Sequence, residues 1–271
     1  MKRWRVLVIG ENINSSIKEV EAAILQRNGS YIKDLARRQK DAGADYLEVN
    51  SGLRLYPQEE AEDLEWLVPL IQEETGLPIC IDSAHALVHQ AALRHHQGRA
   101  ILNSINGDME SWKEILPLAK EHGCGIIALL SDRQGIPGAA AGRVKIAEKI
   151  IQGISHYGLS PEILYLDLLV MPISVNTGNG LVVLETLKEL KRSFPQVKTV
   201  AALSNISYGL PRRRLLNQAF VIMALEAGLD AAIINPLDQR LMALMKAAQA
   251  LLNRDAFCMN YIQAFRQGRL G

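Results

Sequence analysis

Apolar runs along this sequence repeatedly end in a side chain that can donate or accept hydrogen bonds. Amides and carboxylates at such ends, with no lysine among them, suit a neutral heterocycle, because an aspartate can accept two parallel hydrogen bonds from a guanidine-like edge. A reduced pterin has such an edge. Each asparagine alone could also be an ordinary turn or cap residue, but the recurrence favours a binding site. The residues at these ends are Asn14, Asn50, Asp82, Asn106, Asp167, Asn205 and Asn235.

The segment 199–220, TVAALSNISYGLPRRRLLNQAF, is the most informative of these regions. It begins as a β-branched apolar run, which predicts a buried strand, and then becomes polar at Ser204 and Asn205. Pro211 stands where a helix would begin, and three arginines follow it. Polar side chains at a strand end, with cations at the next helix start, indicate a ligand site. An ordinary strand–loop–helix connection with a solvated basic turn is the alternative at this point.

Strand and helix patterns alternate through the whole chain. About eight short apolar runs are each followed by helical spacing, and no linker rich in Pro, Gly or Ser divides the chain. Strands buried on both faces read as continuous apolar runs, as these do. The 271 residues therefore predict one domain, a (β/α)8 TIM barrel spanning 1–271. A doubly wound sheet is the alternative, but no GxGxxG motif follows the first strand.

The bounds of these elements can be estimated from the same patterns. The expected strands cover about 6–9, 46–52, 78–83, 100–104, 125–130, 163–167, 197–200 and 231–235. The expected helices cover about 31–42, 59–75, 91–95, 112–122, 144–157, 181–191, 211–227 and 241–252, and a short helical tail is expected from Asp255.

The composition narrows the class of protein. The net charge is +1 and hydrophobic residues make up 48% of the chain, which indicates a folded domain and gives no support to nucleic-acid binding through a basic surface. No apolar run is long enough for a membrane span. The three cysteines are far apart, so they form neither a disulfide framework nor a CxxC metal site. We expect a soluble protein of the reducing cytoplasm.

Several motifs together resemble one known family. They are IGENIN, GADYLEVNSG, PICIDS, ILNSIN, LYLDLLVMP, ALSNIS and AGLDAAIINP, and they extend over nearly the whole chain. The sequence looks like the methyltetrahydrofolate:corrinoid protein methyltransferases of the pterin-binding barrel group, to which dihydropteroate synthase also belongs. The resemblance implies methyl transfer between N5 of tetrahydrofolate and the cobalt of cobalamin, which a separate corrinoid protein carries. It also implies a homodimer.

The same resemblance implies roles for individual residues. Asp82, Asn106 and Asp167 would bind the pterin ring. Asn205 would contact N5 of the folate, and Arg213 would lie near the pterin or its glutamyl tail. The expected folate-binding set is completed, in the loop of Asn205, by Ser204 and Tyr208.

The chain departs from the family pattern mainly around the seventh strand. It has Ala202 where relatives often have glycine, Tyr208 where a glutamine is expected, and YGLPRRR in place of an asparagine-rich turn. Asp167 is followed by leucine rather than proline, and Glu48 stands where aspartate is more usual. We therefore expect differences in folate contacts to concentrate in the seventh loop.

The implied reaction has clear physical requirements. The methyl group on N5 is bound to a tertiary amine, which is a very poor leaving group. Transfer therefore needs a strongly nucleophilic Co(I) and a proton or strong hydrogen bond delivered to N5. Asn205 would supply a hydrogen bond that strengthens in the transition state, while the proton would come from solvent or through a relayed water. The reverse reaction uses the same site, and the sequence leaves the direction open.

No protein-bound metal is expected. His85 and His89 stand at i, i+4 spacing, but no third ligand is obvious. Two other functions remain open, a non-catalytic pterin-binding scaffold in a corrinoid assembly and another barrel enzyme such as an aldolase. A Schiff-base aldolase needs a buried lysine, and a phosphate-sugar enzyme needs a glycine-rich loop. Neither feature stands at the expected strand ends.

Overall fold

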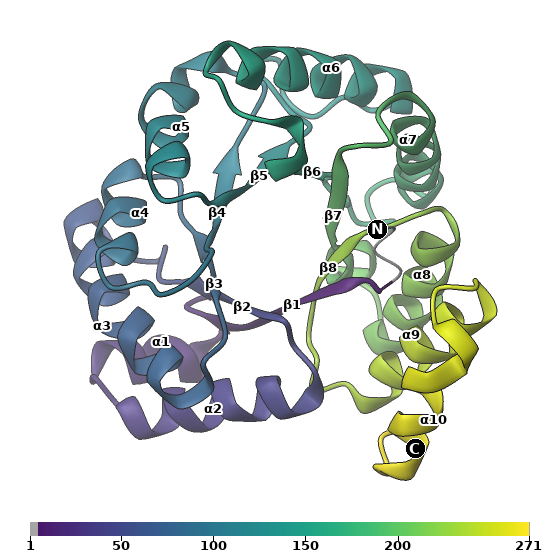
Figure 1. The fold of residues 1–271 in the computed structure, drawn as a ribbon, viewed down its shortest axis with the longest axis horizontal. Coiled ribbons are helices and arrows are strands. Elements are labelled where there is room, and N and C mark those ends of the chain that lie inside the picture. Colours follow the sequence, from purple (N-terminus) through teal and green to yellow (C-terminus); the bar gives the residue numbers. More distant parts are fainter. Residues whose placement is uncertain (1–4, 271) are drawn as a thin grey trace.

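The computed structural model describes residues 5–270. Eight parallel strands close into a barrel in chain order, with β8 pairing back onto β1. Helices form a ring around this barrel (Figure 1). The predicted (β/α)8 TIM barrel is confirmed. The strands are β1 (Leu7–Asn14), β2 (Tyr46–Asn50), β3 (Ile79–Asp82), β4 (Ile101–Ile105), β5 (Gly125–Leu129), β6 (Leu164–Asp167), β7 (Lys198–Ala202) and β8 (Ala231–Ile234).

The surrounding helices begin and end at recognisable signals. The second helix follows Asn28, whose side chain accepts the Tyr31 N–H, and it ends at Gly43 in the left-handed conformation. The third has Pro57 at its first position and Gly76 after its end. The helices are α1 (Lys18–Leu25), α2 (Gly29–Ala42), α3 (Pro57–Thr75), α4 (Ala86–Leu93), α5 (Trp112–Glu121), α6 (Ala140–His156), α7 (Asn179–Ser193), α8 (Arg213–Glu226), α9 (Gln239–Leu251) and α10 (Met259–Arg266).

Helix α1 is the element that the sequence patterns do not predict. It spans only eight residues, so its periodicity is too short to stand out. Val20 and Ile24 are nevertheless buried, and the helix packs against both β1 and α2. It therefore forms one wall beside the carboxyl end of the barrel.

The side chains inside the barrel change from apolar to polar along the strands. Side chains alternate with a period of two residues, and an apolar layer is followed by a polar one two residues further on. The apolar layer contains Ile9, Cys80, Ile101, Ile127, Tyr165, Val200, Ala231 and Ile233. The polar layer contains Glu11, Glu48, Asp82, Asn103 and Asp167. The polar side chains thus lie toward the carboxyl ends of the strands, where TIM-barrel active sites are found.

A larger apolar core separates the barrel from its helices. Outward strand residues such as Leu47 and Ile81 are fully buried with helix residues such as Leu64 and Ile150. Each such side chain contributes about 1.5–3 kcal/mol by leaving water, which makes the barrel a rigid support for the polar layer. Among the described residues, no helix is both long and apolar enough to cross a membrane.

Candidate functional site

Four carboxyl groups come together at the carboxyl end of the barrel. Glu11, Glu48, Asp82 and Asp167 come from four different strands, and the charges of the other three act on Glu48. Glu48 also accepts a hydrogen bond from Nδ2 of Asn103 at 3.2 Å, and both side chains are buried. A layer of this kind can bind a ring that carries several N–H groups.

Asp82 is held in place by amides and hydroxyls from neighbouring strand ends. Asn50 donates from Nδ2 to Oδ2 of Asp82 at 2.9 Å. Oδ1 of Asn50 accepts the Ser15 hydroxyl at 3.2 Å. Within residues 5–270, the other carboxylate oxygen of Asp82, Oδ1, has no hydrogen-bond partner. One oxygen is therefore fixed by the protein and the other is available to a ligand.

Burial raises the pKa of every carboxyl group in this cluster. Desolvation raises the pKa of Asp82 and that of Asp167 from 3.8 to about 6, and that of Glu11 from 4.5 to about 7. Burial together with the charge of Asp82 raises the pKa of Glu48 well above 4.5. Near neutral pH the cluster therefore combines carboxylates, which accept, with a carboxylic acid, which donates. Such a mixture is typical of functional sites.

The raised pKa of Asp167 predicts an inverted pH dependence of stability. A carboxyl group with a raised folded-state pKa stabilises the fold fully below its unfolded-state pKa of about 4. This contribution is lost as the pH rises through the folded-state value of about 6. We expect Asp167→Asn to remove on the order of 1 kcal/mol of pH dependence between about pH 5 and 7.5. Urea unfolding at several pH values measures this, and parallel profiles for wild type and variant would contradict it.

Most of the polar strand ends also form turns. In each, the side-chain oxygen accepts the backbone N–H two residues later, which is the geometry of an Asx turn. Asn50 combines both roles, because Oδ1 accepts the Gly52 N–H while Nδ2 holds Asp82. The turn and binding explanations are therefore compatible. The residues in such turns are Asn14, Asn50, Asn106, Asp167 and Asn235.

Asn106 lies directly after β4 rather than within the polar layer. Its side chain accepts the Asp108 N–H at 2.8 Å, and its backbone oxygen accepts the Trp112 indole N–H at 2.6 Å. Asn103, inside the strand, is the β4 amide that contacts the carboxyl cluster. A pterin contact by Asn106 stays a prediction, and the geometry favours Asn103.

The loop after β7 brings three of the predicted residues together. The Ser204 hydroxyl donates to Oε2 of Glu11 at 3.1 Å. Arg213 donates to the backbone oxygen of Ser204 at 2.8 Å and to the Ser207 hydroxyl at 3.1 Å. The Arg213 guanidinium also lies 5.6 Å from the ring centre of Tyr208. Arg213 thus holds the loop in place next to the carboxyl cluster.

Asn205 differs from the other strand-end amides. It is exposed in the 3-10 turn Leu203–Ser207, directly after Ser204. Its backbone oxygen accepts the Tyr208 N–H, but its side chain has no hydrogen bond within the part of the chain that the structure describes. Asn205 therefore does not form the Asx turn that the sequence allowed. Its amide can turn toward a ligand at the rim.

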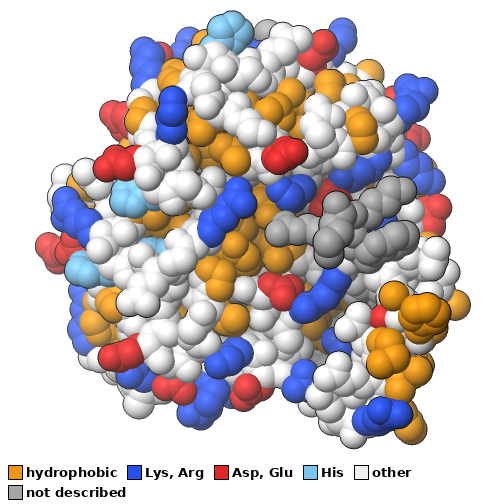
Figure 2. Space-filling view, in the orientation of Figure 1, with side chains coloured by type: hydrophobic (Ala, Val, Ile, Leu, Met, Phe, Trp, Pro, Cys, Tyr) orange, Lys and Arg blue, Asp and Glu red, His pale blue; other side chains and the backbone are white. Residues whose placement is uncertain are grey.

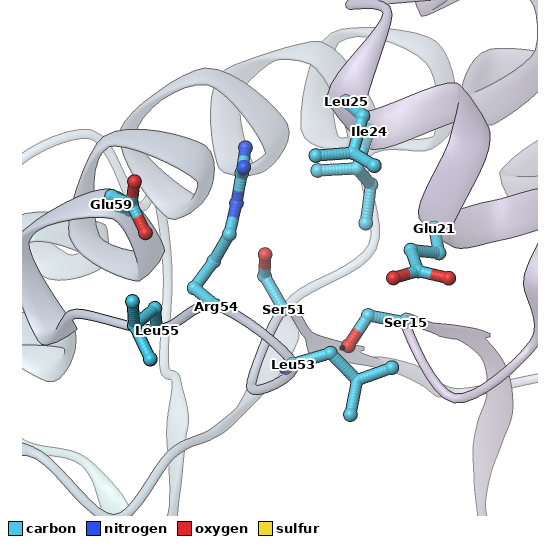
Figure 3. A pocket seen from close by; sticks show the side chains of 9 residues that line it. All are labelled: Ser15, Glu21, Ile24, Leu25, Ser51, Leu53, Arg54, Leu55 and Glu59. Carbon is cyan, nitrogen blue, oxygen red and sulfur yellow. Dashed lines mark hydrogen bonds between the residues drawn. The ribbon is translucent and has the colours of Figure 1, made fainter.

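A cavity of about 150 Å³ lies beside the cluster, between α1 and the loop after β2 (Figure 3). Ser51 and Arg54 line it, and both donate to buried Asp63, at 2.5 and 2.6 Å. Arg27 pairs with the same carboxylate at 2.9 Å. Asp63 therefore fixes the loop that follows Asn50, and through Asn50 it supports the orientation of Asp82.

The two histidines at helical spacing do not form a pair. Nε2 of His89 lies 3.0 Å from the backbone oxygen of Ser83, and burial lowers the pKa of His89 to about 4. His85 is exposed and is the N-cap residue of α4. Among residues 5–270, no group of three or more His, Cys, Asp or Glu side chains could hold a metal ion.

The sequence patterns miss Glu11 and Asn103 as members of the site. Both lie inside strands, whereas the polar residues that the sequence marks as candidates lie at strand ends. Glu11 follows Ile9 by two residues, and Asn103 follows Ile101 by two. Ile9 and Ile101 face the barrel interior, so the two-residue alternation of a strand is the signal that identifies both polar residues.

Comparison with known proteins adds independent information. The model of the family described as pterin binding enzyme matches residues 18–235. The chain is 31% identical over 268 residues to methylcorrinoid:tetrahydrofolate methyltransferase of Eubacterium limosum, with 98% of each protein covered. It is 32% identical over 243 residues to methionine synthase of Mycobacterium tuberculosis, which covers 85% of this chain but only 20% of that longer protein.

A solved structure shows the same fold. Dihydropteroate synthase from Xanthomonas albilineans, in complex with 7,8-dihydropteroate, superposes with a TM-score of 0.66. The sequences are 18% identical, and the match covers 93% of this chain and 94% of the other. This likeness concerns the fold alone, but it agrees with the family match and with the similarity along almost the full chain. The protein therefore belongs to the pterin-binding enzyme family, among its methyltransferases.

Proposed function

We propose that this protein transfers a methyl group between N5 of tetrahydrofolate and the cobalt of a corrinoid that a separate protein carries. The observation that carries this proposal is the layer of amides and carboxyl groups at the barrel mouth, with Asn205 at its rim, whose side chain has no hydrogen bond within residues 5–270. The 31% identity along 98% of a methylcorrinoid:tetrahydrofolate methyltransferase supports it.

In this proposal the pterin ring lies on the carboxyl cluster. Its guanidine-like edge donates to Asp82 and Asp167, which accept through carboxylate oxygens. Burial and the neighbouring carboxylates favour the protonated form of Glu48, which can donate to an acceptor atom of the ring or to a neighbouring carboxylate. Asn205, on the loop after β7, donates its amide N–H to N5. The hydrogen bond from Asn205 is then the main protein contact that is stronger in the transition state than in the bound substrate.

The proton of N5 needs a group that exchanges protons near neutral pH, and an amide does not. Glu11 contacts Ser204, the neighbour of Asn205, and has a pKa of about 7. When the methyl group leaves N5 for Co(I), the electron pair of the N–C bond stays on N5, which takes a proton from Glu11. When tetrahydrofolate is methylated, N5 gives its proton to Glu11 and the Co–C electron pair remains on cobalt.

The corrinoid protein has to approach the barrel mouth. Exposed apolar side chains lie on loops that follow alternate strands, with Leu55 after β2, Met109 after β4 and Val175 after β6. They are 79%, 52% and 76% exposed. Apolar groups around a polar pocket are typical of a protein contact surface, and we assign this rim to the corrinoid partner.

We also propose a homodimer through a second apolar surface. Leu251, Phe257 and Phe265 are 88%, 92% and 73% exposed, and Figure 2 shows hydrophobic side chains gathered over α10, at the lower right. Exposed patches of this kind mark interfaces. Changing Phe257 and Phe265 together to aspartate should give a monomer by light scattering. A monomeric wild type at micromolar concentration would contradict the dimer.

Absorption spectroscopy tests the proposed activity. The protein is mixed with methyltetrahydrofolate and free cob(I)alamin under reducing conditions. A metal chelator is included, because the proposed reaction uses no zinc and should proceed in its presence. Loss of the cob(I)alamin spectrum and appearance of methylcobalamin are expected, and both should require folate and protein. Tight folate binding without any methyl transfer, in either direction, would favour a non-catalytic scaffold.

A further inference from the structure

Arg143 is a buried cation to which the proposed mechanism gives no part. It is the fourth residue of α6 and only 2% exposed. Burial lowers its pKa, but a guanidinium stays charged near neutral pH. Within residues 5–270 it forms no ion pair with a carboxylate. A buried charge without a counter-ion is costly, and a cation in the first turn of a helix is disfavoured by the helix dipole. The stability of α6 therefore does not explain this residue.

The guanidinium of Arg143 donates to three backbone oxygens on two loops at the barrel mouth. Nε donates to the oxygen of Pro137, in the loop after β5, at 3.0 Å. Nη1 donates to the oxygen of Leu168 and, at 3.2 Å, to that of Leu169, both in the loop after β6. Because one planar cation binds all three oxygens, the side chain connects the two loops.

The loop after β5 is packed closely against the start of α6. A Cβ atom added at Gly142 would lie 2.7 Å from Cβ of Pro137, closer than carbon atoms that are not bonded approach each other. The Pro137 carbonyl is therefore fixed beside Arg143, and Nε is committed to it. This contact directs the other end of the guanidinium toward the loop after β6.

The bond to Leu168 continues directly to Asp167. The Leu168 carbonyl and the Leu169 N–H belong to one peptide group, in which they point in opposite directions. The carbonyl accepts from Arg143, and the N–H donates to Oδ1 of Asp167 at 2.8 Å. Hydrogen bonds in such a chain polarise one another. Oδ2 of Asp167 has no hydrogen-bond partner in the described chain, so it is available to a ligand.

This peptide is held in a conformation that leucine rarely adopts. Leu169 has a φ of 49°, in the left-handed region. A residue of this kind keeps its conformation only where the surrounding structure imposes it. Arg143 binds the carbonyls of both Leu168 and Leu169, one on each side of the strained Cα. It therefore holds the Leu169 N–H in the direction of Asp167.

The charges around Asp167 show what this contact does. Burial is the main cause that raises the pKa of Asp167 to about 6, and the charge of Asp82 adds to it. The bond from the Leu169 N–H and the positive charge of Arg143 act in the opposite direction. Glu48 belongs to the same cluster, and its own pKa is raised by the charge of Asp167. Asp167 thus faces acids from β2 and β3 and a cation from α6.

We propose that Arg143 is a positioning residue, which acts through the Leu168–Leu169 peptide to hold Asp167 as an oriented carboxylate for the N–H edge of the pterin. The inference rests on the proposed function, because it takes a pterin as the ligand of Asp167. Arg143 itself does not contact the substrate in this proposal. Its effect on folate binding should therefore depend on the presence of the Asp167 carboxylate.

A double-mutant cycle tests this dependence. Wild type, Arg143→Gln, Asp167→Asn and the double variant are titrated calorimetrically with methyltetrahydrofolate at pH 7.5. Arg143→Gln should weaken binding about fivefold to tenfold, the range of one hydrogen bond to a charged group. In the Asp167→Asn background the same change should have an effect of about twofold at most, because the group on which it acts is absent. Equal factors in both backgrounds would overturn the inference.

The pH profile distinguishes positioning from a structural role. Wild-type folate affinity should fall below about pH 6, where Asp167 takes up a proton. In Arg143→Gln the fall should begin at a higher pH, because the cation and the aligned N–H no longer favour the carboxylate. Arg143→Lys should restore part of the profile, since it keeps the charge without the planar fork. Parallel profiles in wild type and Arg143→Gln would contradict the proposal.

Leu169→Ile tests the same peptide with the buried guanidinium still present, which matters if Arg143→Gln does not fold. A β-branched residue resists the left-handed conformation, so folate binding should weaken about fivefold. Leu169→Gly should weaken it less, because glycine adopts this conformation readily. Wild-type affinity in a folded Leu169→Ile protein would refute the role of the peptide.

Arg38→Gln is the matched control, because it has the same net charge as Arg143→Gln. Arg38 is exposed and lies near the C-terminal end of α2, away from the barrel mouth. This variant should bind folate as wild type does and should have the same pH profile. A loss of affinity equal to that of Arg143→Gln would show that net charge, rather than the bonds of Arg143, causes the effect.

The outcome is separable from the proposed function. Methyl transfer by wild type, without coupling between Arg143 and Asp167, would remove this inference alone. Coupling of the two residues in folate binding, without methyl transfer, would keep the inference and remove the enzyme activity.

Discussion

Replacing Asn205 by alanine is expected to lower the rate of methyl transfer on the order of 10²–10³-fold, as removal of one transition-state hydrogen-bond donor commonly does. Asn205 is exposed at the rim of the barrel, and its side chain is not hydrogen-bonded within residues 5–270. The variant loses no internal hydrogen bond, so its melting temperature should stay near that of wild type. Folate affinity should fall less than the rate, because the contacts at Asp82 and Asp167 remain.

Asn14→Ala is the matched control for this variant. Asn14 is also a strand-end amide, but its side chain accepts the Ser16 N–H in an Asx turn. We expect Asn14→Ala to lose some stability and keep the rate of methyl transfer. Single-turnover rates at saturating folate, together with melting curves, separate the two effects. An Asn205→Ala protein that binds folate and transfers methyl at the wild-type rate would remove Asn205 from the mechanism.

Alanine at Asp82 or Asp167 is expected to weaken folate binding by about 1–3 kcal/mol, because a pterin donor loses its charged acceptor. Asp82 offers one carboxylate oxygen that the described residues leave unbonded, while Asn50 holds the other. Asp167 is buried, and it accepts the Leu169 N–H. Titration of folate into each variant measures the change in Kd.

Each variant also loses an internal hydrogen bond, so stability has to be measured beside binding. Asp167→Ala loses the bond from the Leu169 N–H, and Asp82→Ala loses the bond from Nδ2 of Asn50. Asp41→Ala, an exposed carboxylate on α2, controls for the change in net charge. Unchanged folate affinity in both folded variants would refute their place in the pterin site.

The affinity should also depend on pH. The pKa of both aspartates is about 6, so acceptance of pterin N–H groups should weaken as the pH falls below that value. The contribution of Asp167 to stability changes in the opposite direction over the same range. Ligand binding and fold stability therefore respond oppositely to acid, because the ligand needs the charged form that burial disfavours.

The fold could be read from the sequence because its signals are local and repeated. Runs such as Gly125–Leu129 are apolar on both faces, and only a parallel sheet covered by helices buries both. The glycine after α2 marks the end of that helix in the sequence. Helix α1 was not predicted from the sequence, because its eight residues form only about two turns and show too little periodicity.

The site could be predicted only in part from the sequence, because an asparagine at a strand end can either form a turn or contact a ligand. Asn106 and Asn235 are strand-end amides whose side-chain oxygens accept the backbone N–H groups of Asp108 and Leu237, two residues further on. Asn205 looks the same in sequence, yet its side chain makes no hydrogen bond to the residues that the structure describes. The hydrogen bond from Ser204 to Glu11 connects the loop after β7 to β1, and the two residues are 193 positions apart in the sequence. Barrel closure creates such contacts, and no local pattern contains them.

The most direct measurement of the central claim is transfer of an isotopic label in a single turnover. Methyltetrahydrofolate carrying ¹³C in its N5-methyl group is mixed with stoichiometric protein and free cob(I)alamin, and NMR follows the label. The account predicts that the ¹³C signal moves from N5 to cobalt, that labelled methylcobalamin returns it to tetrahydrofolate, and that Asn205→Ala slows both directions. Label that stays on the folate while the wild-type protein binds it, with cob(I)alamin present and unreacted, would contradict the account.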